Sequence, residues 1–264
     1  MRANPVLANT GSRSVFDLAA DSYDAARPSY PDGLFAELER RTGRLAGRLV
    51  LDWGAGTGIA SRQLTERGAR VISLDIGEQM LRRAHARSPL TPCVQADGNR
   101  MPVRAGSADL VTFAQSWHWF DQRAASAEVA RVLRPGGYWA AWWNRASGAG
   151  EPWFDRYEDV LAVSCPGFTW RHERDETLAQ DSSSALEGTL LMEPIGHEVV
   201  PWTRQVKAAD WFTDEQSKSY IIGLEPTVRE SVLRQLAEIV MAQFPDGQMT
   251  VPYLTTLVAA RRTV

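Results

Sequence analysis

Cysteine is scarce in this sequence of 264 residues, since only Cys93 and Cys165 occur. They have neither the spacing of metal ligands nor the density of a disulfide-stabilised domain. We therefore expect both thiols to be reduced and structural. The histidines outside the candidate site show no ligand spacing either, and we predict no metal site.

Long apolar runs and an excess of charge of one sign are also absent. No segment approaches the roughly 18 consecutive apolar residues that a membrane-spanning helix requires, and residues 1–14 lack the apolar centre of a secretory signal. The 29 basic and 32 acidic side chains are interspersed, so no basic surface for phosphate backbones stands out. We predict a cytoplasmic protein that binds neither nucleic acid nor a membrane. The oligomeric state stays open.

What the sequence does contain is a repeating unit of apolar run, glycine or aspartate turn, and amphipathic helix over residues 48–145. The runs at 49–51, 71–74, 93–96, 110–114 and 138–143 are the expected strands. Each helix between them is long enough for a crossover, so these strands should be parallel. Two further strands, near 197–202 and 250–260, are expected to close the sheet as an antiparallel hairpin.

The predicted fold is therefore α/β, with a doubly wound, mostly parallel sheet of seven strands. We expect a mobile leader at 1–14 and a single domain over 15–264. Within that domain we predict N-terminal lid helices at 15–47, a cofactor-binding core at 48–145, and a helical substrate cover with the last strands at 146–264. Helices are expected there at 152–163 and 227–243.

A glycine-rich turn follows the first strand. Gly54, Gly56 and Gly58 let the backbone approach a ligand without interference from Cβ atoms. The nicotinamide pattern G-x-G-x-x-G would need a further glycine where Ile59 or Ser61 stands. The tighter spacing favours the amino-acid end of a nucleoside cofactor over a pyrophosphate.

Acidic residues end the next two strands. Asp75 lies 21 residues beyond the first glycine of the turn, where a carboxylate can hold both hydroxyls of a ribose. Asp97 can accept a hydrogen bond from an adenine amine, while the backbone N–H of Gly98 or Asn99 meets a ring nitrogen. Met80 offers an apolar surface to the ring face. An aspartate after a strand is usually a turn former, but acids in register at successive strand ends favour a site.

These motifs together resemble those of class I S-adenosylmethionine-dependent methyltransferases over residues 15–145. The motifs are LDWGAGTG at 51–58, LDI at 74–76, QADG at 95–98, ADLV at 108–111 and RVLRPGG at 131–137. A looser similarity at 219–221, 252–253 and 259–262 is shared with a small-molecule branch, type 11, that includes trans-aconitate methyltransferase-like proteins. The resemblance implies the Rossmann-like methyltransferase fold, S-adenosylmethionine as cofactor and a small-molecule acceptor.

The resemblance also implies roles for individual residues. Asp52 and the three glycines would flank the methionine part of the cofactor, and the backbone around Gln115 would line the sulfonium. Tyr23 and Arg27 would close over the cofactor carboxylate, or else form a mere junction between a helix and a turn. The predicted cofactor-binding set is Tyr23, Arg27, Asp52, Gly54, Gly56, Gly58, Asp75, Ile76, Met80, Asp97, Gly98, Asn99 and Gln115.

The candidate catalytic base is His118, directly after the fourth strand. A histidine can remove a proton from a hydroxyl, a thiol or an acidic carbon. It can equally bond a neighbouring group and shape the pocket, and a carboxylate acceptor would need no base. Because insertions after strands vary function in such folds, we predict that the substrate pocket includes Trp117, Trp119, Trp153, Trp211 and Tyr220. The ten tryptophans could equally fill the core.

Three functions stay open from the sequence. The first is methyl transfer to oxygen, nitrogen, carbon or a carboxylate of a small metabolite. The second is a nicotinamide-dependent oxidoreductase, which the broken glycine pattern disfavours. The third is a protein that binds S-adenosylmethionine without transferring methyl, for example one that catalyses a cyclisation.

Overall fold

The computed structural model describes residues 27–97, 100–148, 150–166, 168 and 191–263. The predicted leader at 1–14, the lid residues before Arg27 and the polar segment 169–190 lie outside the described residues.

A seven-stranded sheet with the order β3-β2-β1-β4-β5-β7-β6 forms the centre of the molecule. The five strands of the first half are parallel, and β7 runs antiparallel to both β5 and β6. This confirms the predicted doubly wound, mostly parallel sheet and its antiparallel closure. The strands are β1 (Leu49–Trp53), β2 (Arg70–Asp75), β3 (Cys93–Gln95), β4 (Ala108–Ala114), β5 (Leu133–Ala146), β6 (Met192–Lys207) and β7 (Gln248–Arg262).

Helices cover both faces of the sheet, which is why its central strands are apolar on both sides. Side chains of α3 (Asp32–Thr42) and α4 (Ile59–Glu66) share one apolar cluster, and those of α6 (Gln122–Val132) share the opposite one. Successive residues of β5 alternate between the two clusters, with Trp139 in one and Trp142 in the other. Asp121 caps α6, because its carboxylate accepts hydrogen bonds from two backbone N–H groups.

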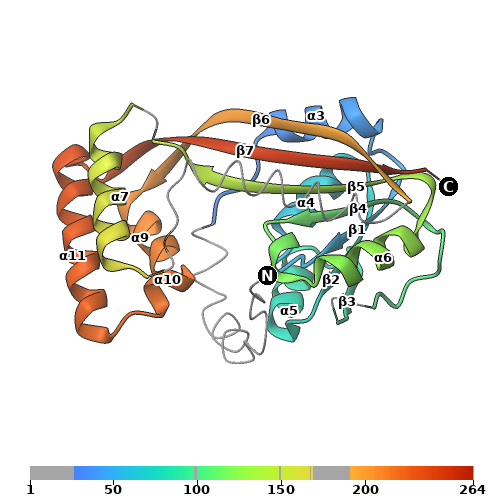
Figure 1. Cartoon of the computed structure of the whole chain (residues 1–264), viewed down its shortest axis with the longest axis horizontal. Helices are drawn as coiled ribbons and strands as arrows, with labels where there is room; N and C mark the ends of the chain where they lie inside the picture. The colour runs from blue at the N-terminus through green and yellow to red at the C-terminus, as the bar shows by residue number, and fades with distance from the viewer. Residues whose placement is uncertain (1–26, 98–99, 149, 167, 169–190, 264) are drawn as a thin grey trace, which may run out of the picture.

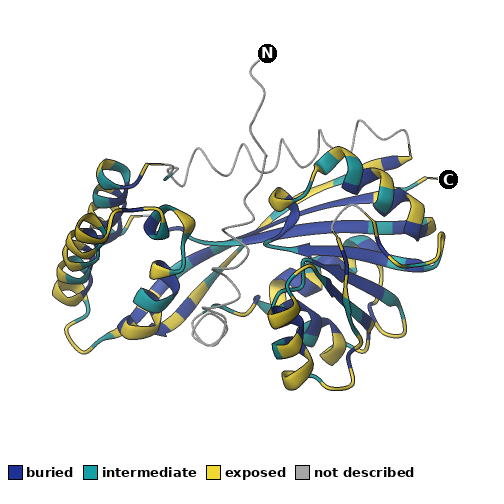
Figure 2. Cartoon of the chain, turned by 90° about the horizontal axis from the view of Figure 1, so that it is seen from below, coloured by how far each residue is buried: buried dark blue, intermediate teal, exposed yellow. Residues whose placement is uncertain are grey.

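Two short elements complete this core, α5 (Glu78–Arg87) and the single 3₁₀ turn η1 (Trp117–Trp119). The buried residues of the central strands form the dark band of Figure 2, and the outer helix faces are exposed.

Strands β5, β6 and β7 are much longer than the sequence predicts, with 14, 16 and 15 residues. They extend beyond the core to a second group of helices, here called the cap (Figure 1). The cap has its own apolar cluster, to which the ends of β6 and β7 contribute. Its helices are α7 (Pro152–Ser164), α9 (Ala208–Gln216), α10 (Ser219–Ile222) and α11 (Pro226–Gln243).

The helices α7 and α11 match the predicted 152–163 and 227–243 closely. Within the described part of the chain, no helix combines the length and apolar character that crossing a bilayer demands.

Candidate active site

The glycine turn lies at the carboxyl end of β1, where the strand order reverses between β2 and β4. Ligands of open α/β sheets bind at this point. Gly54, Gly56 and Gly58 have φ angles of 71°, 56° and 78°, a region that side chains rarely adopt. A Cβ atom on Gly54 would lie 2.6 Å from Ser116 Cβ, whereas one on Gly56 would meet nothing within 4 Å. Packing therefore requires the first glycine, and the second leaves an open backbone surface.

Asp75 fixes this turn from the end of β2. Its carboxylate accepts hydrogen bonds from the backbone N–H of Gly56 and of Gly77, both at 2.8 Å. The side chain is half-buried at the end of β2, where ribose hydroxyls would meet it.

Ile76, next in the chain, is 41% exposed and Met80 only 8%, so Ile76 presents more apolar surface beside the carboxylate. Asp97 is exposed beyond the end of β3, as a contact with the adenine amine would require.

Asp52 does not face a ligand through its side chain. It is fully buried, and its carboxylate accepts hydrogen bonds from the hydroxyls of Ser61 at 2.6 Å and Thr112 at 3.0 Å. The prediction that Asp52 flanks the cofactor therefore cannot rest on its side chain. The carboxylate instead braces β1 below the glycine turn. Burial raises its pKa to about 6, although both hydroxyls oppose the shift.

This raised pKa predicts how stability depends on pH. The folded protein holds the Asp52 proton up to about pH 6, whereas the unfolded chain releases it near its ordinary pKa. The carboxyl's contribution to stability is thus complete below pH 4 and is lost as the pH rises to 6, a change of about 3 kcal/mol. In urea unfolding, Asp52→Asn should therefore gain stability relative to the wild type between pH 4 and 7. Parallel stability curves for the two proteins would contradict this.

A cavity of about 130 Å³ lies between the carboxyl end of the sheet and the cap. Gln115, at its floor, follows β4 with a φ of 60°, the one positive φ among described residues other than glycine. Such backbone strain is typical of functional sites. The next residue, Ser116, is the one that packs against Gly54, so the cavity and the glycine turn adjoin.

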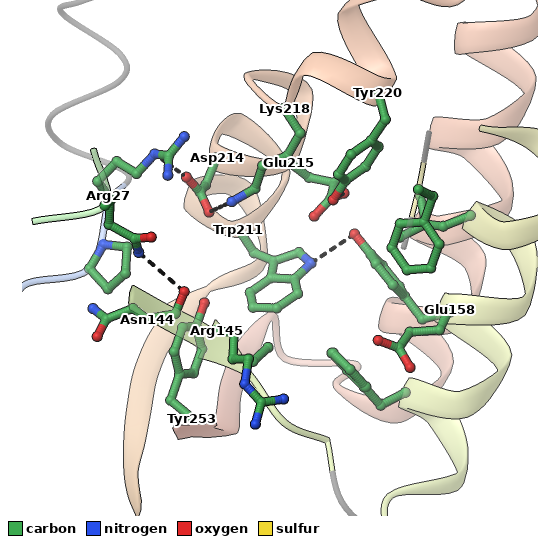
Figure 3. Close-up of a pocket in the computed structure, with 17 residues that line it drawn as sticks. Arg27, Asn144, Arg145, Glu158, Trp211, Asp214, Glu215, Lys218, Tyr220 and Tyr253 are labelled. Carbon is green, nitrogen blue, oxygen red and sulfur yellow. Dashed lines mark hydrogen bonds and ion pairs between the residues drawn. The ribbon is translucent and has the colours of Figure 1, made fainter. Parts of the chain in front are cut away.

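Aromatic and charged side chains line this cavity (Figure 3). The aromatic ones are Phe154, Tyr157, Phe168, Trp211, Tyr220 and Tyr253. The charged ones are Arg27, Arg145, Glu158, Asp214, Glu215 and Lys218, three of each sign.

The structure separates the predicted pocket residues into two groups. Trp211 and Tyr220 line the cavity. Trp117 and Trp153 do not, because each is at most 1% exposed and packs in an apolar cluster of the core or the cap, so their prediction as pocket walls is wrong. Trp119 is 55% exposed and does not line the cavity, which also contradicts its prediction.

His118 bonds to the core rather than facing the cavity. The indole N–H of Trp143 lies 3.2 Å from His118 Nδ1, and an indole nitrogen can only donate. The lone pair of the neutral ring therefore accepts from Trp143, and the proton resides on Nε2. Since this lone pair is the one a base would use, the geometry supports the alternative in which His118 shapes its surroundings.

Arg27 is placed against the cap. Its Nε atom lies 2.9 Å from Asp214 Oδ1, so the guanidinium compensates a buried carboxylate of the cap. Closure of Arg27 over the cofactor carboxylate stays a prediction. Its predicted partner Tyr23, with Gly98 and Asn99, lies outside the described residues.

The charged side chains of α7, of α9 and of the turn after α9 that line the cavity were not predicted from the sequence. Asp214 and Lys218 have the i,i+4 spacing of an ordinary ion pair on a helix, which indicates a solvated face as readily as a site. Asp214 and Lys218 line a cavity only because the carboxyl end of the sheet lies opposite them, and this packing cannot be seen in the sequence.

Residues 51–141 match the family described as "Methyltransferase domain". An uncharacterised methyltransferase of Mycobacterium tuberculosis (strain ATCC 25618 / H37Rv) is 32% identical over 251 residues, which cover 93% of this chain and 94% of that protein. The chain belongs to the methyltransferase family.

Solved structures share the fold of this methyltransferase. One named for a type II methyltransferase from Anaeromyxobacter dehalogenans has a TM-score of 0.67 and 23% identity, covering 90% of this chain and 98% of its own. Phosphoethanolamine N-methyltransferase 2 of Haemonchus contortus, in complex with S-adenosyl-L-methionine, has a TM-score of 0.56 and 15% identity, covering 96% and 60%. These likenesses are of fold.

S-adenosylmethionine is the cofactor of this methyltransferase. The residues fit it, because the open surface over Gly56 adjoins a carboxylate at the end of β2 and an exposed acid beyond β3. Asp75 would hold the ribose, the glycine turn the amino-acid part, and Asp97 the adenine amine.

Proposed function

We propose that this methyltransferase acts on a small molecule that binds in the cavity between sheet and cap. The observation that carries the proposal is the position of the cavity. Its floor is Gln115, one residue from the side chain that packs on the glycine turn, and its walls come from α7, α9 and α10. A walled space of about 130 Å³ suits a small acceptor rather than a macromolecular surface.

S-adenosylmethionine supplies an electrophilic methyl group, and the protein must orient an acceptor in line with it and exclude water. Aromatic side chains provide the dry walls. The side chain of Gln115 is held in place, because its Nε2 donates to the carbonyl oxygen of Asn144 at 3.1 Å. The carboxyl end of β4 is therefore a rigid floor on which an acceptor can be positioned.

Filling the cavity should stop methyl transfer. In Ala146→Phe a large ring would occupy the space that Ala146 lines, so transfer should fall at least tenfold (~1.4 kcal/mol) while cofactor affinity is retained. The assay incubates the protein with isotope-labelled S-adenosylmethionine and a metabolite panel, and detects the gain of one methyl by mass spectrometry. Val163→Phe, at a cap position that is 88% exposed, is the matched control and should behave as wild type. Full turnover in Ala146→Phe would refute the proposed acceptor site.

A further inference from the structure

The two adjacent acids of α9 have different environments. The Asp214 carboxylate is compensated twice, by Arg27 at 2.9 Å and by Lys218 at 3.1 Å (Figure 3). Burial opposes ionisation of this group, but the two cations prevail and lower the pKa of Asp214. Asp214 is thus a satisfied structural charge, and its cations are engaged by it.

Glu215 lines the cavity and is 6% exposed. Within the part of the chain that the structure describes, no Lys, Arg or His nitrogen forms an ion pair with it, and burial raises its pKa. Buried carboxylates ordinarily have a cation partner. Glu215 therefore lacks, among the described residues, the direct ion pairs that its neighbour has, and Lys218 acts on it only through space.

One phenol holds the Glu215 carboxylate in place and a second lies beside it. Tyr220 Oη donates to its Oε1 at 2.8 Å, and the hydroxyl of Tyr157 is near enough to lower its pKa. Tyr157 in turn accepts a hydrogen bond from the indole N–H of Trp211 at 3.1 Å, and burial raises its pKa so that it stays protonated. A carboxylate has about four acceptor positions, so two phenols leave capacity for a donor in the cavity.

The groups around this carboxylate suit a cation. Trp211, Tyr157 and Tyr220 bring aromatic rings to the same wall, and aromatic faces attract ammonium groups, more strongly when water is excluded. A carboxylate acceptor would find a less favourable environment, because Tyr220 already donates to Glu215 and two of the lining cations already pair with Asp214.

We propose that Glu215 anchors the acceptor and that the acceptor carries a basic nitrogen, a small amine that enters the cavity as its ammonium ion. This inference rests on the proposed function, because it takes the cavity to be the acceptor site. Glu215 is then the specificity-determining residue, with Tyr157 and Tyr220 as positioning residues.

The test uses three probes of one shape, benzylamine, benzyl alcohol and benzoate, titrated calorimetrically into the full chain in the presence of S-adenosylhomocysteine. Benzylamine should bind at least tenfold more tightly than the other two. Glu215→Gln keeps the shape of the side chain and should abolish this preference without changing S-adenosylhomocysteine affinity. Asp159→Asn removes an exposed acid from α7 and should leave the preference intact.

Two results would overturn the inference. One is wild-type protein that binds benzylamine no more tightly than both other probes, a measurement that needs no variant and holds even if Glu215→Gln fails to fold. The other is a folded Glu215→Gln protein, as judged by circular dichroism, that retains the preference. If Ala146→Phe blocks methyl transfer but benzylamine is not preferred, only this inference fails. If Ala146→Phe leaves transfer intact, the proposed acceptor site itself fails.

Discussion

Replacing Asp75 with alanine should weaken S-adenosylmethionine binding about 100- to 1000-fold, as measured by calorimetry. Charge-assisted hydrogen bonds to a carboxylate contribute about 1.5–3 kcal/mol each, and the ribose offers two hydroxyls. The substitution also releases the N–H of Gly56 and of Gly77, which the carboxylate holds in the glycine turn. The substitution therefore removes both the contact with the ribose and the hydrogen bonds that shape the turn.

The matched control for this result is Glu78→Gln, which removes an exposed negative charge three residues further on. Its cofactor affinity should stay within about twofold of wild type, since exposed charges interact weakly through water. The cofactor affinity of Asp75→Asn should lie between those of wild type and Asp75→Ala, because an amide has one acceptor oxygen where the carboxylate has two. Unchanged affinity in Asp75→Ala would remove the basis for placing the ribose at the end of β2.

Gly56→Ala should reduce cofactor affinity about 100-fold (~2.7 kcal/mol) while the protein still folds. The new methyl group would meet no protein atom within 4 Å and would project into the open space over the turn. The left-handed backbone conformation of an alanine costs about 1–2 kcal/mol of stability, which a folded domain of this size tolerates.

Gly47→Ala separates this effect from backbone strain. Gly47 has a φ of 79°, and a Cβ atom there, as on Gly56, would meet nothing within 4 Å, but this glycine precedes β1 on an exposed turn. Its stability loss should match that of Gly56→Ala, and its cofactor affinity should be that of wild type. Equal affinities in the two variants would show that the surface over Gly56 does not receive the ligand.

The parallel half of the fold could be predicted from the sequence because its signals are local. Each strand from β1 to β3 is a short run that is followed within two residues by a glycine or ends in or near an acid, and Gly68, with a φ of 82°, follows the end of α4. The lengths of β5, β6 and β7 could not be predicted. The β6 residues alternate between exposed and half-buried over most of their length, and between β6 and its partner β7 the chain forms the cap helices α9, α10 and α11.

The cofactor side of the site was more predictable than the acceptor side. Glycines and an acid at strand ends mark the turn directly, and the structure joins Gly56 and Asp75 by a hydrogen bond. Tryptophan carried no such information, since it fills cores and lines cavities alike. Trp117 packs in the core, whereas Trp211 packs in the cap and lines the cavity. Which of these places a tryptophan takes is decided by packing between segments far apart in the sequence.

Strand β7 has a mechanical consequence for the molecule. Its residues belong in turn to all three apolar clusters, with Val258 on one face of the core, Leu257 on the other and Val251 in the cap. Within the described residues, three hydrogen-bonded strands join the core to the cap, so a change in the space between core and cap requires bending or twisting of these strands. A force on the cap is thereby transmitted along β5 to its neighbour β4, which is followed by Gln115 at the floor of the cavity.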